Sequence, residues 1–379
     1  MEIRTITAGA READLERVGR AAQAARAALA AAGYTVQTLR LALAATGANR
    51  CGDFATIAQA AEEQALAAGF DYVSLGVVDA ERLAALPEAI RATERLFASA
   101  QIATVDGTVL PETIRAAAAA MAAIGAGTEL GFGNLRFAAA ACVAPGSPFF
   151  PAAYHDGGTP WIAVGPEAAA LAVEAAEHQA RASQAAPGSR LAALAHLTSL
   201  IEQHDARISA ALSGLAADTG VGFAGCDWSL APHPDPARSV GAAVEALAGA
   251  PFGGWGTLAG VRALTAAIRD ARVTRLGFSG VMLPVLEDAT LAARNAEGRY
   301  GVRDLLAFSA VCGTGLDTIP LPGDTAPEQI AGVLLEVATL ASALRKPLTA
   351  RLLPIPGMRA GQLTTFDFPY FVNTRVMSL

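Results

Sequence analysis

The strongest constraint on the fold is an alternation of short strand-like segments with longer helical ones along the 379-residue chain. Residues 3–7 predict a strand, residues 13–32 predict a helix that ends at Gly33, and residues 35–41 predict a half-buried strand. The same order continues through segments at residues 54–68, 72–78, 81–97 and 102–105 and the helix after Pro111. Repeated strand–helix units predict mainly parallel strands joined by helical crossovers, and hence an α/β fold.

The second half of the chain continues this pattern without a break in composition. The predicted strands lie at residues 221–226, 274–281 and 348–353, and the predicted helices at 190–216, 240–247, 257–268, 286–294, 302–311 and 327–344. The segment 145–158 is rich in proline and glycine, but it also carries aromatic residues and a histidine, which favours an ordered loop over a linker. We therefore expect a single domain over residues 1–379, built from two half-barrels.

Composition excludes several classes of partner. With 53% hydrophobic and 17% charged residues, the chain can bury a large core. A net charge of −7 and a pI near 5.3 disfavour a nucleic-acid or anionic membrane surface. The first residues run into a charged segment without an apolar signal region, so we expect a cytoplasmic protein. A small-molecule ligand is the expected partner, and a homo-oligomer is left open.

Lysine and cysteine limit the available cofactor chemistry. Lys346 is the only lysine, so Schiff-base chemistry or a lysine-anchored pyridoxal phosphate would have to use it. The four cysteines, Cys51, Cys142, Cys226 and Cys312, are far apart and form no CxxC pair. A zinc or iron–sulfur site built from paired cysteines is therefore disfavoured, and the sequence requires no cofactor.

The first candidate site is the loop that contains Tyr154 and His155, which precede two glycines. A histidine in such a loop can act as an acid or a base near neutral pH, and Tyr154 could bind a substrate through its hydroxyl group. The alternative is a histidine at the surface or at the edge of the core that only stabilises the loop.

Two further loops could bind a polar ligand. Asp227 and Ser229 follow a predicted strand and point to the same side, so they could contact a ligand or a cation. They could equally satisfy backbone N–H groups of their own loop. Gly253 and Gly254 precede a helix, where exposed N–H groups could bind a carboxylate or phosphate, although a turn without ligand is the commoner outcome.

The fourth candidate is the loop that begins at Cys312 and ends at Asp317. Gly313 and Gly315 would allow close approach to the Cys312 thiol, and a thiolate there could be a nucleophile if His155 lay nearby. Against this, a free cysteine is usually a small buried hydrophobic residue.

These loops resemble one uncharacterised family, domain-of-unknown-function family 711, also called uncharacterised protein family 0210. The matching features follow one another along nearly the whole chain: Ile3-Arg-Thr-Ile-Thr7, Pro148-Phe149 before Tyr154-His155, Asp227-x-Ser-Leu-Ala-Pro232, Gly280 with Pro284 and Glu287-Asp288, and Cys312-x-x-Gly-Leu-Asp317 with Asp324-Thr325. The chain is shorter than typical bacterial members, and its last residues, 367–379, depart from theirs.

The resemblance implies a ten-stranded α/β barrel of two five-stranded halves, like that of pyruvate formate-lyase. In that superfamily a loop cysteine inside the barrel performs thiyl-radical chemistry, fed by a glycyl radical. The glycyl-radical signature Arg-Val-x-Gly-Tyr is missing here, since the nearest string is Arg375-Val-Met-Ser-Leu379. If Cys312 acts, thiolate chemistry or ligand contact is therefore expected.

The leading hypothesis is a non-radical enzyme that acts on a small polar or anionic metabolite in the barrel lumen. Cys312, His155 and Asp227 would be catalytic, and the remaining candidates would bind the substrate: Tyr154, Ser229, Gly253, Gly254, Gly313, Gly315 and Asp317. The competing hypothesis is a non-catalytic metabolite-binding or regulatory protein. A third is a divalent cation held by the oxygen atoms of Asp227, Glu287, Asp288 and Asp317.

Overall fold

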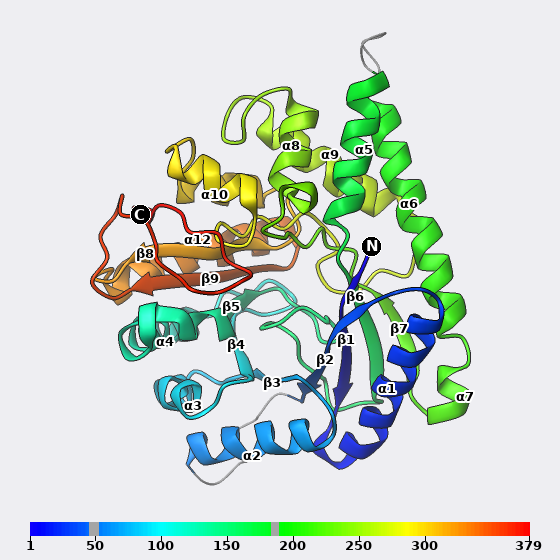
Figure 1. Ribbon diagram of the computed structural model, residues 1–379. Helices are drawn as coiled ribbons and strands as arrows, with labels where there is room; N and C mark the ends of the chain where they lie inside the picture. The colour runs from blue at the N-terminus through cyan, green and yellow to red at the C-terminus, as the bar shows by residue number, and fades with distance from the viewer. Residues whose placement is uncertain (45–52, 183–188) are drawn as a thin grey trace.

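The computed structural model describes residues 1–44, 53–182 and 189–379, so Cys51 lies outside the described residues. Within them one nine-stranded sheet has the order β7-β6-β1-β2-β3-β4-β5-β9-β8 (Figure 1). The strands are β1 (Ile3–Ala10), β2 (Val36–Leu43), β3 (Tyr72–Val77), β4 (Leu96–Ala103), β5 (Phe137–Ala141), β6 (Trp161–Pro166), β7 (Gly222–Cys226), β8 (Gly315–Pro322) and β9 (Leu348–Ile355). The predicted α/β class is confirmed.

The sheet contains two sets of strands that run in opposite directions. Strands β1 to β5 are parallel and adjacent in chain order, with Ile3 opposite Val36 at the start of the β1–β2 pair. Strand β6 pairs antiparallel with β1, and β9 pairs antiparallel with β5. The amino ends of β1 to β5 therefore lie beside the carboxyl ends of β6 and β9.

The segment 274–285, predicted in part as a strand, makes only isolated bridges in the structure. Arg275 bridges to Cys226 and Val281 to Leu230, on the β7 side, while Pro284 bridges to Asp317 of β8. Nine strands are thus joined by regular pairing, and a closed ten-stranded barrel remains a prediction.

Helices cover one face of the sheet and contribute its main apolar core. They are α1 (Leu15–Ala31), α2 (Phe54–Ala67), α3 (Leu86–Ala92), α4 (Pro111–Gly127) and α12 (Pro327–Leu344), which lie at the periphery in Figure 1. Alternate strand residues such as Leu39, Leu41 and Val73 belong to this core, which also contains buried helix residues such as Ala25 and Met121. A strand alternates its side chains, so the intervening residues face the other side.

A second group of helices packs together at the opposite end of the molecule. It comprises α5 (Ala169–Ala182), α6 (Ser189–Ala211), α8 (Val240–Ala248) and α9 (Thr257–Asp270). Three shorter helices complete this half of the chain: α7 (Leu215–Thr219), which contacts α1, α10 (Ala289–Ala296) and α11 (Val302–Ser309). Among the described helices, none is long and apolar enough to cross a membrane.

The loop between β5 and β6 packs on the face of the sheet that the helices leave open. Thr7 Oγ1 donates to the carbonyl of Pro148, Ser74 Oγ donates to that of Ala153, and Gln101 Nε2 donates to that of Val143. Its aromatic residues form two small apolar clusters with Phe97 of β4 and Phe278 of the segment 274–285. The expectation of an ordered loop is confirmed.

Strands β4 and β8 differ from the sequence-based prediction, and β5 and β6 lie where the sequence predicts no strand. The predicted helix at residues 81–97 ends at Ala92, and β4 begins at Leu96, several residues earlier than expected. Strand β8 begins at Gly315, within the loop that the sequence predicts over residues 312–317, and it contains Pro320 and Pro322, which cannot donate to a sheet ladder. It lies at the end of the strand order, where prolines are tolerated. Asp317 is consequently a strand residue.

Candidate functional site

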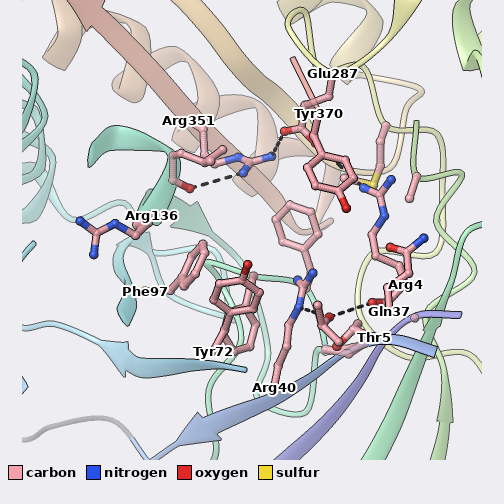
Figure 2. A pocket seen from close by; sticks show the side chains of 18 of the residues that line it. Arg4, Thr5, Gln37, Arg40, Tyr72, Phe97, Arg136, Glu287, Arg351 and Tyr370 are labelled. Atoms are coloured by element: carbon pink, nitrogen blue, oxygen red, sulfur yellow. Dashed lines mark hydrogen bonds and ion pairs between the residues drawn. The ribbon is translucent and has the colours of Figure 1, made fainter. Parts of the chain in front are cut away.

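A cavity of about 590 Å³ lies at the amino ends of β1 to β4. Arg4, Arg40, Tyr72 and Phe97 contribute from these four strands, and Arg351 contributes from β9 (Figure 2). The carboxyl end of β6 and the residues after β7 also line it, because β6 runs antiparallel to β1. A volume of this size is within the range of about 300–1,000 Å³ that is typical of small-ligand sites.

Arg351 joins the cavity wall to two carboxylates. Its Nη2 donates to Glu287 Oε1 at 2.8 Å, its Nε donates to Asp317 Oδ1, and its Nη1 donates to the Leu135 carbonyl at 3.4 Å. Although burial lowers it, these two carboxylates hold the pKa of Arg351 above its ordinary value. The positive charge of Arg351 is therefore already compensated within the protein.

Glu287 is a cavity carboxylate with one oxygen that accepts no hydrogen bond from a described residue. Its Oε1 accepts from Arg351, whereas its Oε2 has Arg4 Nη1 at 4.0 Å (Figure 2). Burial raises the pKa of Glu287, and the nearby Asp317 carboxylate acts in the same direction against Arg351 and Arg4. A carboxyl group with a raised pKa can hold or release a proton closer to neutral pH.

The positive charge of Arg4 is also partly balanced by a nearby carboxylate. Its Nη2 lies 3.5 Å from Glu167 Oε2 and donates to the carbonyl of Pro232. Glu167 is shared with Arg238, whose Nη1 donates to it at 2.8 Å, and with Gln37, whose Nε2 donates at 2.9 Å. Arg4 thus contributes positive charge to the cavity while being held in place by an acidic group.

Arg40 differs from Arg351 and Arg4 because no carboxylate of the described residues lies within ion-pair distance of it. Its Nε donates to Thr38 Oγ1 at 3.0 Å, and its guanidinium lies over the rings of Tyr72 and Phe150 at 5.8 and 5.4 Å. Burial, together with the nearby charge of Arg4, lowers the pKa of Arg40 to about 10. The group therefore remains a cation at neutral pH.

The other walls of the cavity are largely apolar. They include aromatic residues from the β5–β6 loop, from η3 (Glu129–Arg136) and from the C-terminal segment: Phe149, Phe150, Phe132, Phe368 and Tyr370. Phe132 and Phe368 pack edge to face with ring centroids 5.1 Å apart. Arg136 also lines the cavity, but its guanidinium is directed away in Figure 2 and donates to the carbonyls of Ile90 and Thr93.

Of the predicted catalytic residues, only Asp227 lines this cavity, together with the predicted binding residue Ser229. Asp227 Oδ1 accepts from Ser229 N, Ser229 Oγ and Ser279 N, at 3.0, 2.6 and 2.9 Å, and its Oδ2 accepts from Phe278 N at 3.1 Å. Burial raises the pKa of Asp227, although these donors stabilise its charged form. The contacts match the alternative interpretation, in which Asp227 holds its loop.

Cys312 is fully buried and does not line the cavity. Its Sγ accepts from Gly315 N at 3.4 Å, and its carbonyl accepts from Lys346 Nζ. Burial lowers the pKa of Lys346, which also donates to the Ser309 carbonyl at 2.9 Å. Gly313 N donates to the Val281 carbonyl at 2.8 Å, so the loop is fixed against the segment 274–285.

His155 and Tyr154 also lie outside the cavity lining. His155 is 1% exposed; its Nδ1 accepts from Gly157 N at 2.9 Å, so its Nε2 donates to the Thr159 carbonyl at 3.2 Å. Tyr154 Oη donates to the Val143 carbonyl, and burial raises the pKa of its phenol to about 12. The expected convergence of His155, Asp227 and Cys312 on one cavity is therefore not found.

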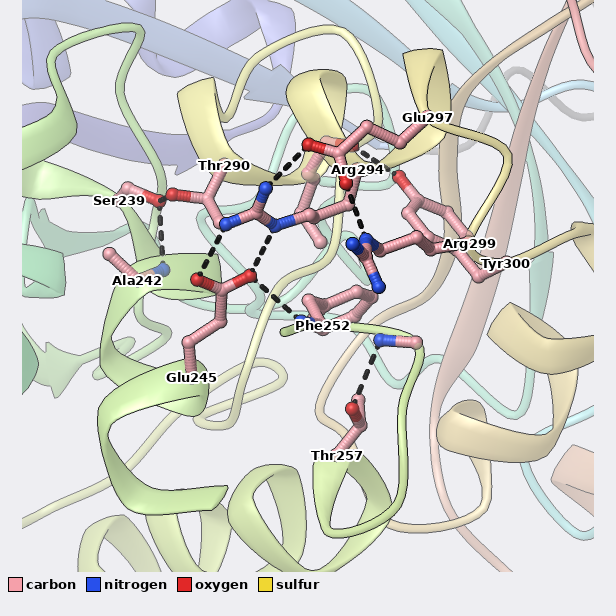
Figure 3. A network of polar contacts seen from close by, with 12 residues as sticks. Ser239, Ala242, Glu245, Phe252, Thr257, Thr290, Arg294, Glu297, Arg299 and Tyr300 are labelled. Carbon is pink, nitrogen blue, oxygen red and sulfur yellow. Dashed lines mark hydrogen bonds and ion pairs between the residues drawn. The ribbon is translucent and has the colours of Figure 1, made fainter. Parts of the chain in front are cut away.

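The two glycines before α9 are used within their own turn. Gly253 N donates to Thr257 Oγ1 at 3.0 Å, and Gly254 N donates to the Pro251 carbonyl at 3.0 Å. Figure 3 shows this loop beside the ion pairs of Arg294 with Glu245 and Glu297. Because these N–H groups already have acceptors, the ligand-free turn that we named as the alternative accounts for both glycines.

The four acidic residues considered for a cation have other partners. Asp288 accepts from Ser239 Oγ at 2.7 Å, from Val240 N at 2.7 Å and from Leu291 N at 3.0 Å, so it caps both α8 and α10. Asp317 and Glu287 share Arg351, as described above. Over residues 1–44, 53–182 and 189–379, no group of three or more His, Cys, Asp or Glu side chains is arranged to hold a metal ion.

Sequence reasoning missed the arginines that define the cavity. Sites in parallel sheets usually collect after the carboxyl ends of strands, whereas this cavity lies at the amino ends of β1 to β4. One signal was present: Arg40 falls on the polar side of an alternating strand, and Arg351 is the single charged residue in the otherwise uncharged β9. A charged residue inside a buried strand needs a partner or a function.

Comparison with known proteins gives one consistent family. The family model described as "Uncharacterised ACR (DUF711)" matches residues 1–367. A UPF0210 protein of Desulforudis audaxviator is 32% identical over 295 residues, which is 76% of this chain and 64% of that protein. Those of Pyrobaculum islandicum and Methanopyrus kandleri are 32% and 30% identical, over 75% and 81% of this chain and 62% and 70% of those proteins. The chain spans about three fifths of the length of the first two of these relatives.

Proposed function

The chain belongs to the DUF711 family of uncharacterised proteins, and from this premise we propose that it is an enzyme that binds a small organic anion in the arginine-lined cavity. The observation that carries the proposal is Arg40, a cation that faces the cavity without a carboxylate partner among the described residues. An uncompensated charge in a largely apolar site is costly unless a ligand supplies the opposite charge.

Glu287 is the group that we propose for proton transfer. It lies beside the arginines, its Oε1 is fixed by Arg351, and its Oε2 accepts no hydrogen bond from a described residue. The raised pKa suits a carboxyl group that takes a proton from a bound substrate or gives one to it. Glu287 is favoured over Cys312 because Cys312 does not line the cavity.

The proposal includes a barrel. Segment 274–285 bridges toward β7 on one side and to β8 on the other, and these are the two end strands of the sheet. A tenth strand in that position would close two five-stranded halves around the cavity. The cavity would then be the lumen site that the family resemblance implies.

A non-catalytic binding protein is the second candidate, and one observation favours it. The expected nucleophile and histidine lie outside the cavity lining, and both oxygens of Asp227 already accept hydrogen bonds, so these three predicted catalytic residues are not free to act on a ligand in the cavity. Prolonged incubation of an identified ligand with the protein, followed by mass spectrometry, separates the two candidates. An unchanged ligand mass and structure would support the binding protein.

The test of binding is a thermal-shift screen of organic anions on the wild type, Arg40→Gln and Arg20→Gln. A ligand at about 100 Kd stabilises a folded protein by about 2.7 kcal/mol, so it raises Tm measurably. We expect at least one anion to raise the Tm of wild type and of Arg20→Gln, whose side chain is exposed on α1, but not that of Arg40→Gln. A hit that stabilises all three proteins equally would contradict binding at Arg40.

A further inference from the structure

We propose that the ligand of the cavity is an organic monocarboxylate with an apolar, aromatic-sized body, and that its carboxylate binds Arg40. This inference rests on the proposed function, because it specifies the chemical class of the anion. It follows from the charges that are still available in the cavity, from the hydrogen-bond donors of its walls and from the side chains that surround Arg40.

The positive charge that is left unbalanced in the cavity suits a ligand with a single negative group. Arg351 is paired with Asp317 and Glu287, and Arg4 lies near Glu167 and Glu287. Arg136 donates to backbone carbonyls outside the ligand space. Among the cavity arginines, Arg40 alone keeps both terminal nitrogens without a hydrogen-bond acceptor among the described residues, and one N–H from each nitrogen matches the two oxygens of one carboxylate.

A dianionic phosphate fits the same cavity poorly. Glu287 lies in the wall and Asp317 lies behind it, so a second negative charge would be repelled by buried carboxylates. Phosphate sites in proteins are also rich in backbone N–H donors. Here the lining includes four residues that have no N–H group, Pro148, Pro166, Pro232 and Pro234.

The remainder of the ligand is expected to be apolar because, apart from the Thr38 hydroxyl, the side chains packed on the Arg40 guanidinium are aromatic rings. Tyr72 and Phe150 pack against the guanidinium, and Phe97 packs against both rings with centroids 5.5 and 5.3 Å away. Phe149 and Met282 continue this wall. A planar or branched hydrocarbon group would replace water on these surfaces, which is favourable by about 25 cal/mol per Å² of apolar area buried.

Isothermal titration calorimetry with four matched probes tests the proposal: 3-phenylpropionate, its amide, phenyl phosphate and acetate. We expect 3-phenylpropionate to bind at least tenfold more tightly than each of the other three. The preference should fall at least tenfold in Arg40→Gln. Arg40→Lys, which keeps the charge but lacks the paired N–H groups, should lose affinity as well and replaces Arg40→Gln if that variant does not fold.

The possible outcomes distinguish this inference from the proposed function. Tighter, Arg40-dependent binding of phenyl phosphate would overturn the monocarboxylate and leave anion binding in place. Equal binding of the acid and its amide would overturn the pairing with Arg40. If none of the four probes binds, the aromatic-sized monocarboxylate is wrong, and the wider anion screen then decides whether the cavity binds anions at all.

Discussion

At the scale of single residues, the cavity is defined by how its charges are paired. Arg351 and Arg4 are held by carboxylates, whereas Arg40 is held by aromatic rings and one hydroxyl group. The sequence predicts that Arg40 is on the polar face of its strand, but not that it lacks a partner. That depends on where every carboxylate lies after folding, which local periodicity does not specify.

Glu287 gives a residue-scale prediction about pH. Burial raises its pKa above the unfolded value of about 4.3, so the folded protein binds more protons between the two pKa values. The stabilising contribution is complete below the unfolded pKa and is lost as the pH rises through the folded pKa. We expect the free energy of unfolding of the wild type to fall, relative to Glu287→Gln, by at most about 1.4 kcal/mol per pH unit in that window.

Urea unfolding of both proteins at several values between about pH 4.5 and pH 7.5 measures this difference. Glutamine keeps an oxygen that can accept from Arg351, so the variant tests ionisation with little change in shape. Parallel pH profiles for the two proteins would show that the pKa of Glu287 is not raised by folding. If the wild type instead gained stability relative to Glu287→Gln with rising pH, folding would lower the pKa of Glu287, which would contradict the prediction.

At the scale of elements, helices were easier to predict than the strands that build the site. Helices α1, α2, α8, α9 and α12 begin and end close to the predicted residues, since caps and prolines at helix starts are local signals. The sequence predicts neither β5 nor β6; the alanine-rich β5, with residues 137–141, gives no alternation of polar and apolar residues. Strand β8, which carries Asp317, contains two prolines, and prolines disfavour a strand in a sequence-based prediction.

The close contact between the Cys312 loop and the segment 274–285 leads to a prediction at the element scale. A Cβ on Gly313 would lie 2.6 Å from Gly280 Cα, 2.7 Å from its carbonyl carbon and 3.0 Å from its nitrogen, and all three are backbone atoms that cannot rotate away. We expect Gly313→Ala to destabilise the protein by about 1–3 kcal/mol through overpacking. Urea unfolding, with the midpoint and the slope both fitted, is the measurement.

Gly332→Ala is the matched control for this substitution. Gly332 lies inside α12, is exposed, and has open space where a Cβ would be placed. Alanine there should stabilise the helix by about 0.5–1 kcal/mol. If Gly313→Ala proved as harmless as Gly332→Ala, the close approach of the two loops would be absent in solution.

At the scale of the whole molecule, Arg351 connects parts of the chain that are far apart in sequence. From β9 it reaches Asp317 of β8, Glu287 after the segment 274–285, and the carbonyl of Leu135 in η3. Removal of the guanidinium would leave the buried Asp317 without an ion-pair partner and Glu287 with only its 4.0 Å contact to Arg4. A buried pair that loses one partner typically costs about 3–5 kcal/mol of stability, and we expect a loss of this size for Arg351→Met.

The double variant Arg351→Met, Asp317→Asn separates charge from packing in this cluster. It also lacks the buried Asp317 carboxylate that Arg351→Met leaves unpaired, so part of the lost stability should return. Arg20→Met is the comparison for an exposed pair: Arg20 and Glu16 are 66% and 91% exposed, and little change in stability is expected there. If Arg351→Met were no more destabilising than Arg20→Met, the cluster could not be what holds β8, β9 and the Glu287 segment around the cavity.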